Sequence, residues 1–161
     1  MKLYHGSIDI VEKPEIRESN RTLDYGKGFY CTTSYDQAVD WVKRRLKEHD
    51  VNLGFVNVYE FNEDLMNSFK SLSFESPTEE WLDFVMNNRT NRDYCHDYDI
   101  VYGPVANDRV YAAFALYEGG VLNKQELISE LKTYKLVDQY LFHTEKALSA
   151  LQFIEEKEVM K

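Results

Sequence analysis

The side chains best suited to bind a ligand lie in two short segments of the N-terminal third. The first is His5-Gly6-Ser7, and the second runs from Asp24 to Trp41. The second segment contains Gly26 and Gly28 directly before the aromatic pair Phe29-Tyr30. Glycines placed in this way allow a ligand to approach the backbone closely. The two segments therefore predict a ligand site in the first third of the chain.

The other reactive side chains form no recognisable metal or redox motif. Cys31 and Cys95 lack C-x-x-C spacing and have no nearby set of His and Cys residues with metal-site spacing. We interpret Cys31 as a small strand residue, and His96 and His143 as structural or exposed histidines. Asn107-Asp108 is explained by helix capping, although a substrate role stays open.

Hydrophobic periodicity and capping residues predict an irregular alternation of strands and helices. Strands are expected at Leu3–His5, Phe29–Thr33, Leu53–Phe61, Tyr98–Val105, Gln139–Phe142 and Leu151–Ile154. Helices are expected after the capping residues Ser34, Ser76, Asn107 and Asn123, with a helical turn over Thr144–Ala150. The irregular alternation favours an α+β fold over a regular parallel series.

Two details of this prediction concern the binding segments. The helix after Ser34 carries Ala38, Trp41, Val42 and Leu46 at helical spacing, so we expect its Trp41 side to lie on a sheet. The polar stretch from Arg17 to Thr22 is expected to form a surface loop.

The composition indicates one domain and disfavours several classes of function. The 161 residues, 43% of them apolar, suit a single domain spanning 1–161, with the charged residues 155–161 as a frayed tail. A net charge of -9 argues against non-specific binding to nucleic acid, which needs clustered Lys and Arg. Neither a signal peptide nor an apolar run of about 18 residues is present, so we expect a cytoplasmic protein that does not contact membranes.

The binding segments resemble the NAD-binding half of the ADP-ribosyltransferase fold, in its diphtheria-toxin and poly(ADP-ribose) polymerase branch. The resemblance lies in Tyr4-His5-Gly6, in Asp24 to Tyr30, and in Ala38 and Trp41 on the following helix. Nearly the whole chain is similar to an uncharacterised bacterial family assigned to that fold. The resemblance implies two small, mainly antiparallel sheets around an NAD cleft, with flanking helices.

The resemblance also implies a role for each residue of the binding segments. His5 would hold the adenosine ribose hydroxyl, and the backbone of Gly6 would pair with the nicotinamide carboxamide. Tyr30 would stack on the nicotinamide ring, and Trp41 would supply a second aromatic face. A cationic ring is attracted to aromatic faces electrostatically as well as by dispersion. Ser7, Asp24 and Gly28 would complete the NAD-binding residues, and no metal is implied.

The chain departs from the family pattern at the third catalytic position. There the polymerase group has a glutamate that supports the oxocarbenium-like transition state, and this chain has Gln139, giving a His5-Tyr30-Gln139 triad. A carboxylate offsets developing positive charge better than a neutral amide does. Gln139 could orient the ribose, or could be an ordinary strand amide. Asp138 or Asp108 could supply the missing charge.

The resemblance implies an enzyme, an NAD-dependent mono-ADP-ribosyltransferase that moves ADP-ribose from NAD to a macromolecular acceptor and releases nicotinamide. A bacterial toxin-type effector with a small antitoxin protein as partner is implied by the family association. Two alternatives remain open: a non-catalytic protein of this fold that binds NAD or a partner, and an NAD glycohydrolase. The sequence does not distinguish a protein acceptor from a nucleic acid.

Overall fold

The structure, a computed structural model, describes residues 1–17, 23–104, 108–134 and 136–161. In these ranges the elements are β1 (Lys2–Ser7), β2 (Phe29–Thr32), α1 (Tyr35–His49), β3 (Leu53–Phe61), a 3₁₀ helix η1 (Glu63–Ser68), β4 (Ser71–Ser73), α2 (Glu79–Thr90), β5 (Ile100–Pro104), α3 (Asp108–Glu118), α4 (Lys124–Lys132), β6 (Asp138–Phe142), α5 (Glu145–Leu148) and β7 (Leu151–Met160). The predicted α+β class is confirmed. Most of the loop predicted from Arg17 to Thr22 lies outside the described residues, as do Val105 and the capping residue Asn107.

The strands form one mixed sheet with the order β4-β5-β6-β2-β1-β3-β7. All neighbours are antiparallel except β4 and β5. The prediction of two small sheets is therefore wrong, because β2 pairs with β6 on one side and with β1 on the other. The pairing of β1 with β2 consists of Tyr4 opposite Thr32, so a short junction connects two larger halves.

The C-terminal residues form an edge strand of this sheet. β7 pairs with β3 from Leu151 opposite Phe61 to Met160 opposite Leu53, with a bulge between Val58 and Tyr59. The prediction of a frayed tail at 155–161 is thus wrong. The charged side chains that suggested a tail are also typical of exposed edge strands, where they discourage pairing with other chains.

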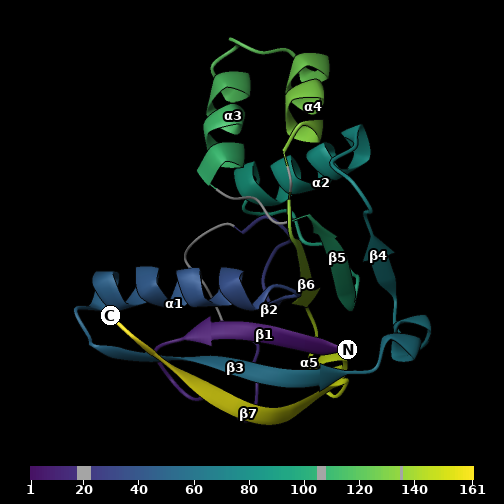
Figure 1. Ribbon diagram of the computed structural model, residues 1–161. Helices are drawn as coiled ribbons and strands as arrows, with labels where there is room; N and C mark the ends of the chain where they lie inside the picture. The colour runs from purple at the N-terminus through teal and green to yellow at the C-terminus, as the bar shows by residue number, and fades with distance from the viewer. Residues whose placement is uncertain (18–22, 105–107, 135) are drawn as a thin grey trace.

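Helix α1 lies along β1 and β3 and packs on them through Ala38, Val42 and Leu46 (Figure 1). Ser34 caps the helix as predicted, accepting a hydrogen bond from the backbone N–H of Gln37. The predicted contact of Trp41 with the sheet is only partly right, since Trp41 is 38% exposed. The three buried residues are spaced four apart, and this spacing leaves Trp41 on the flank of the packed strip.

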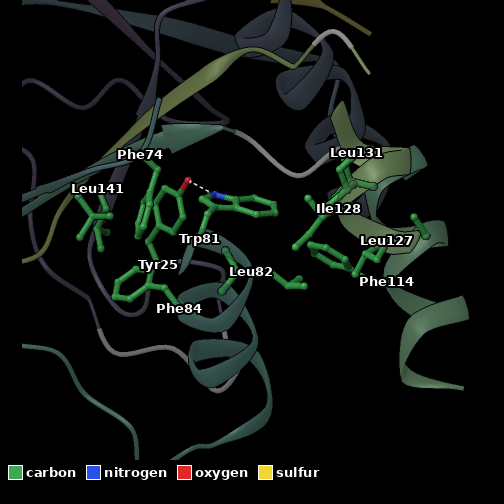
Figure 2. Packing of buried hydrophobic residues seen from close by; sticks show 14 residues of the cluster. Tyr25, Phe74, Trp81, Leu82, Phe84, Phe114, Leu127, Ile128, Leu131 and Leu141 are labelled. Atoms are coloured by element: carbon green, nitrogen blue, oxygen red, sulfur yellow. Dashed lines mark hydrogen bonds between the residues drawn. The ribbon is translucent and has the colours of Figure 1, made fainter. Parts of the chain in front are cut away.

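Helices α2, α3 and α4 gather beyond β5 and β6, at the far end of the molecule from β7 (Figure 1). Their apolar side chains form a core with Tyr25, Phe74 and Leu141, in which Trp81 Nε1 donates to the Tyr25 hydroxyl at 2.8 Å (Figure 2). Helix α2 begins at Glu79 with Thr78 as N-cap, two residues after the predicted cap Ser76. Because both residues can cap a helix, sequence alone did not separate them.

A second core covers the other face of the sheet, where Phe29, Tyr140 and Phe142 pack with α5. Adjacent strand residues point to opposite faces. Hence Gln139 and Leu141 face the α2–α4 side, whereas Tyr140 and Phe142 face the second core. Within the described residues, none of the helices has the length and apolar character needed to span a bilayer.

Candidate functional site

The pairing of β1 with β2 brings His5 and Tyr30 together. His5 Nδ1 lies 2.6 Å from the backbone carbonyl oxygen of Tyr30. A carbonyl can only accept, so Nδ1 carries the proton and Nε2 of the neutral ring keeps its lone pair. The imidazole stacks on Phe29 at 4.1 Å between ring centroids, and burial lowers the pKa of His5 to about 4. His5 is therefore a neutral hydrogen-bond acceptor at neutral pH.

Gly6 lies directly beneath helix α1. A Cβ atom at this position would lie 2.6 Å from the carbonyl oxygen of Ala38, 2.9 Å from Val42 and 3.3 Å from Cδ1 of Trp41. A glycine is thus required here by the close approach of helix and strand. The same contact places the exposed indole of Trp41 next to the Gly6 backbone. Ser7 ends the strand, and its hydroxyl accepts a hydrogen bond from the N–H of Asp9.

Tyr30 organises the turn before it, residues Asp24–Gly28, which we name the glycine loop. The Tyr30 hydroxyl donates to the carbonyl of Gly26 and accepts from the N–H of Tyr25. Burial raises the pKa of Tyr30 well above its ordinary value, so the hydroxyl stays protonated. Gly28 adopts a φ of 153°, and a Cβ there would lie 2.5 Å from the carbonyl oxygen of Phe142. The predicted close approach at this glycine is therefore to β6.

Asp24 is 8% exposed and forms an ion pair with Arg89 of α2 at 3.3 Å. Tyr111 of α3 also donates to this carboxylate at 3.5 Å, and the Arg89 guanidinium lies 4.8 Å from the Tyr111 ring centroid. Burial raises the pKa of Asp24, and Arg89 opposes this shift. Arg89 and Tyr111 were missed by sequence reasoning. Their separation along the chain from Asp24 left no local signal that could have found them.

Two histidines from other parts of the chain donate hydrogen bonds to backbone carbonyls of the glycine loop. His96 Nε2 donates to the carbonyl of Tyr25 at 2.7 Å, and His143 Nδ1 donates to the carbonyl of Lys27 at 2.5 Å. Their ring centroids are 4.2 Å apart. Burial lowers the pKa of His96, and the nearby His143 adds to this effect. The interpretation of His96 as structural is confirmed, and His143 combines a structural hydrogen bond with partial exposure.

Gln139 lies on β6, opposite Thr32 of β2 and Gly103 of β5, and is 8% exposed. It lies beside the hydroxyl of Tyr25, and its side chain partly opposes the rise in the pKa of Tyr25 that burial causes. That hydroxyl donates to the carbonyl of Pro104 and accepts from Trp81 Nε1. An ionised glutamate at this position would face the lone pairs of the hydroxyl. Tyr4, Thr32 and Gln139 form one row across three strands, which puts Gln139 roughly 10 Å from β1.

The two acids considered as substitutes for a glutamate are differently placed. Asp138 accepts a hydrogen bond of 2.6 Å from the hydroxyl of Tyr102, and precedes Gln139 on the strand, so its side chain points to the opposite face. The side chain of Asp108 lies outside the described residues. Asp138 is therefore not positioned to replace a carboxylate at Gln139.

Two hollows in the surface lie away from His5, Gly6, Tyr30 and Trp41. One, of about 490 Å³, is lined by Met1 and residues 60–64, and the other, of about 240 Å³, lies between the ends of β5 and α4 and includes Asp138. Neither is lined by His5, Gly6, Tyr30 or Trp41. Across the ranges given above, no group of three or more acidic, His or Cys side chains is arranged to hold a metal ion.

The structure thus joins His5 to the Tyr30 backbone and places Gly6 beside Trp41, but the His5 imidazole lies with Phe29 on the opposite face of β1 from Trp41, and Gln139 is two strands from His5. Comparison with known proteins adds one match, to the family model described as "Protein of unknown function (DUF3990)", over residues 1–153. Neither the curated proteins nor the solved structures include a match to the chain. Because the family model covers nearly the whole sequence, the chain belongs to the DUF3990 family.

Proposed function

We propose that this protein is an NAD-dependent mono-ADP-ribosyltransferase with an ADP-ribosyltransferase-like fold, which binds NAD between β1, β2 and α1. The observation that carries the proposal is the hydrogen bond from His5 Nδ1 to the Tyr30 carbonyl, at 2.6 Å. It joins the two motif positions expected on either side of nicotinamide. The transfer would release nicotinamide and attach ADP-ribose to a macromolecule, in the manner of a toxin-type effector restrained by a small antitoxin protein.

The state of His5 suits the role given to it. Its Nε2 atom carries a lone pair, because Nδ1 holds the proton and the pKa of about 4 keeps the ring neutral. A ribose hydroxyl would donate to Nε2. The stacking on Phe29 and the hydrogen bond to Tyr30 fix the ring before NAD arrives, which reduces the ordering that binding requires.

The surroundings of Gly6 suit a flat cationic ring. Trp41 is 38% exposed beside the Gly6 backbone, so part of its indole is accessible to a ligand, and the Arg44 guanidinium lies 5.6 Å from the ring centroid. The ring of Tyr30 is fixed by the two hydrogen bonds of its hydroxyl. Nicotinamide in NAD carries a positive charge, and contact with an aromatic face contributes roughly 0.5–2 kcal/mol in such pairs.

A second candidate function, a non-catalytic protein that binds NAD or a partner, is favoured by the environment of Gln139. Gln139 is 8% exposed and lies beside the Tyr25 hydroxyl, which is hydrogen-bonded to Trp81 and Pro104. A side chain with this structural task is not free to orient a ribose. The third possibility, an NAD glycohydrolase, needs the same cofactor contacts with water as acceptor.

Calorimetric titration with NAD is the first test. The transferase, the glycohydrolase and the non-catalytic NAD-binding protein all require NAD to bind, and only a protein that binds a partner alone does not. Trp41→Ala should weaken NAD binding about tenfold, and Trp41→Phe should restore most of the affinity by keeping an aromatic face. Leu116→Ala, at an exposed site on α3, is the matched control. No binding by the wild type, or equal binding by Trp41→Ala, would contradict the proposal.

Incubation with labelled NAD and cell lysate separates the candidates that bind NAD. Label on a macromolecule supports the transferase, and free ADP-ribose alone supports the glycohydrolase. Retained binding with neither product supports the non-catalytic protein. Gln139→Glu should not increase NAD cleavage while the carboxylate faces the lone pairs of the Tyr25 hydroxyl, and a faster reaction would place residue 139 at the ribose.

A further inference from the structure

The segment between α2 and β5 places an exposed thiol against an imidazole. The Sγ atom of Cys95 lies 3.9 Å from Nε2 of His143 and 3.5 Å from the carbonyl oxygen of His96. The thiol has one proton for these two acceptors. Only the imidazole nitrogen can take that proton away, because a backbone carbonyl is not basic enough.

The orientation of His143 is fixed so that its free lone pair faces the sulfur. Nδ1 donates to the carbonyl of Lys27, which leaves Nε2 unprotonated in the neutral ring. The adjacent imidazole of His96 is fixed through both of its nitrogens, by the Tyr25 carbonyl and the Tyr98 N–H. With the two rings only 4.2 Å apart, His96 supports His143 from the side.

We propose that Cys95 and His143 form a thiol–imidazole pair that makes Cys95 a modification site for peroxides and soft electrophiles. His143 Nε2 removes the thiol proton, and the thiolate is the nucleophile. With hydrogen peroxide, the sulfur attacks one oxygen and the O–O bond breaks. The leaving hydroxide takes the proton from His143, so the products are a sulfenic acid and water, with sulfur oxidised and peroxide reduced.

Modification of Cys95 acts on the glycine loop through His143. A sulfur that carries an adduct needs more room than the thiol, and the ring of His143 is the group that it contacts. Displacement of this ring breaks its hydrogen bond to Lys27, next to Gly26 and Gly28. The Gly26 carbonyl of this loop also accepts a hydrogen bond from the Tyr30 hydroxyl. The change therefore reaches the ring that is proposed to stack on nicotinamide. This second step, regulation of NAD binding, rests on the proposed function.

Iodoacetamide labelling followed by intact mass tests the thiol. The chain contains an internal control, because Cys31 is 2% exposed and should not react in the folded protein. We expect one adduct, on Cys95, formed at least about tenfold faster than on the same residue in the urea-unfolded chain. His143→Asn keeps a donor for the Lys27 carbonyl but removes the base, and should lower the rate to that of the unfolded chain.

Three outcomes would overturn this assignment: a native rate no higher than the unfolded rate, an unchanged rate in a folded His143→Asn variant, or labelling of Cys31 first. Cys95→Ser should abolish the adduct. Calorimetry of the labelled protein with NAD then tests the second step, with an expected loss of affinity of at least threefold. A fast thiol in a protein that never binds NAD would refute the proposed function and leave the thiol–imidazole pair standing.

Discussion

The half-buried histidine of β1 should make the protein sensitive to acid in a defined pH window. Burial lowers the pKa of His5 from 6.5 to about 4, the hydrogen bond to Tyr30 partly opposes this shift, and Arg17 adds to it. In the unfolded chain the ring takes up its proton near the ordinary value. Between these two values the unfolded state binds more protons than the native state, so the free energy of unfolding falls as the pH falls.

The size of the effect follows from the two pKa values. Each unit of difference corresponds to about 1.4 kcal/mol, so full protonation of the unfolded state lowers the stability by roughly 3 kcal/mol. The free energy of unfolding has its full value well above pH 6.5, and it falls by roughly 2 kcal/mol between pH 7 and pH 5. For a domain with a total stability of about 5–15 kcal/mol, this loss is readily measured.

Urea titrations of the wild type and of His5→Asn, at pH 7 and pH 5, isolate this effect. Asparagine retains an N–H near the position of Nδ1 and has no group that titrates in this range, so its loss of stability should be smaller by roughly 2 kcal/mol. His49→Asn makes the same change at an exposed position of α1 and is the control. Equal losses in the wild type and in His5→Asn would refute the argument that the folded protein keeps His5 neutral.

Three further predictions concern stability. Gly6→Ala should lower the free energy of unfolding by roughly 1–3 kcal/mol, because the new Cβ would lie 2.6 Å from the Ala38 carbonyl oxygen, and an unchanged urea midpoint would contradict this contact. Deletion of 155–161 should lower the thermal midpoint, because it removes the partner of β3 from Leu53 to Val58, and a truncated chain as stable as the wild type would show that this pairing contributes nothing. Arg89→Gln should lower stability by roughly 3 kcal/mol by leaving the Asp24 carboxylate unpaired, and by much less when combined with Asp24→Asn. Additive effects in that double-mutant cycle would rule out the coupling.

Much of the secondary structure followed from local signals. The strand Leu53–Phe61 was predicted with its observed bounds, and the cap at Asn123 was confirmed, with Glu126 completing a capping box, because alternation and capping depend on residues close in sequence. The short elements η1 and β4 were missed. A strand as short as Ser71–Ser73 has no periodicity to detect, and it forms because β5 lies beside it.

The residues of the candidate site were predictable in type but not in their partners. The glycines and aromatic residues before β2 indicated a close backbone approach, and Gly6 and Gly28 are both required by contacts with neighbouring elements. The sequence did not indicate that the hydroxyl of Tyr30 would close the glycine loop, or that His96 and His143 would hold it. The bonds of His96 and His143 join segments 71 and 116 residues apart. Tyr30 lies only four residues from Gly26, but no local pattern indicates that its hydroxyl turns back to that carbonyl.

The sequence by itself determined where most of the helices and longer strands form, and it placed a neutral amide at position 139. Only the tertiary structure decided what that amide does. The Tyr25 hydroxyl, tied to Pro104 and Trp81, leaves a lone pair that an amide N–H can satisfy and an ionised carboxylate cannot. The same packing paired Asp24 with Arg89 and Cys95 with His143. Such pairs depend on how the sheet and the helices pack together, and no spacing along the chain encodes them.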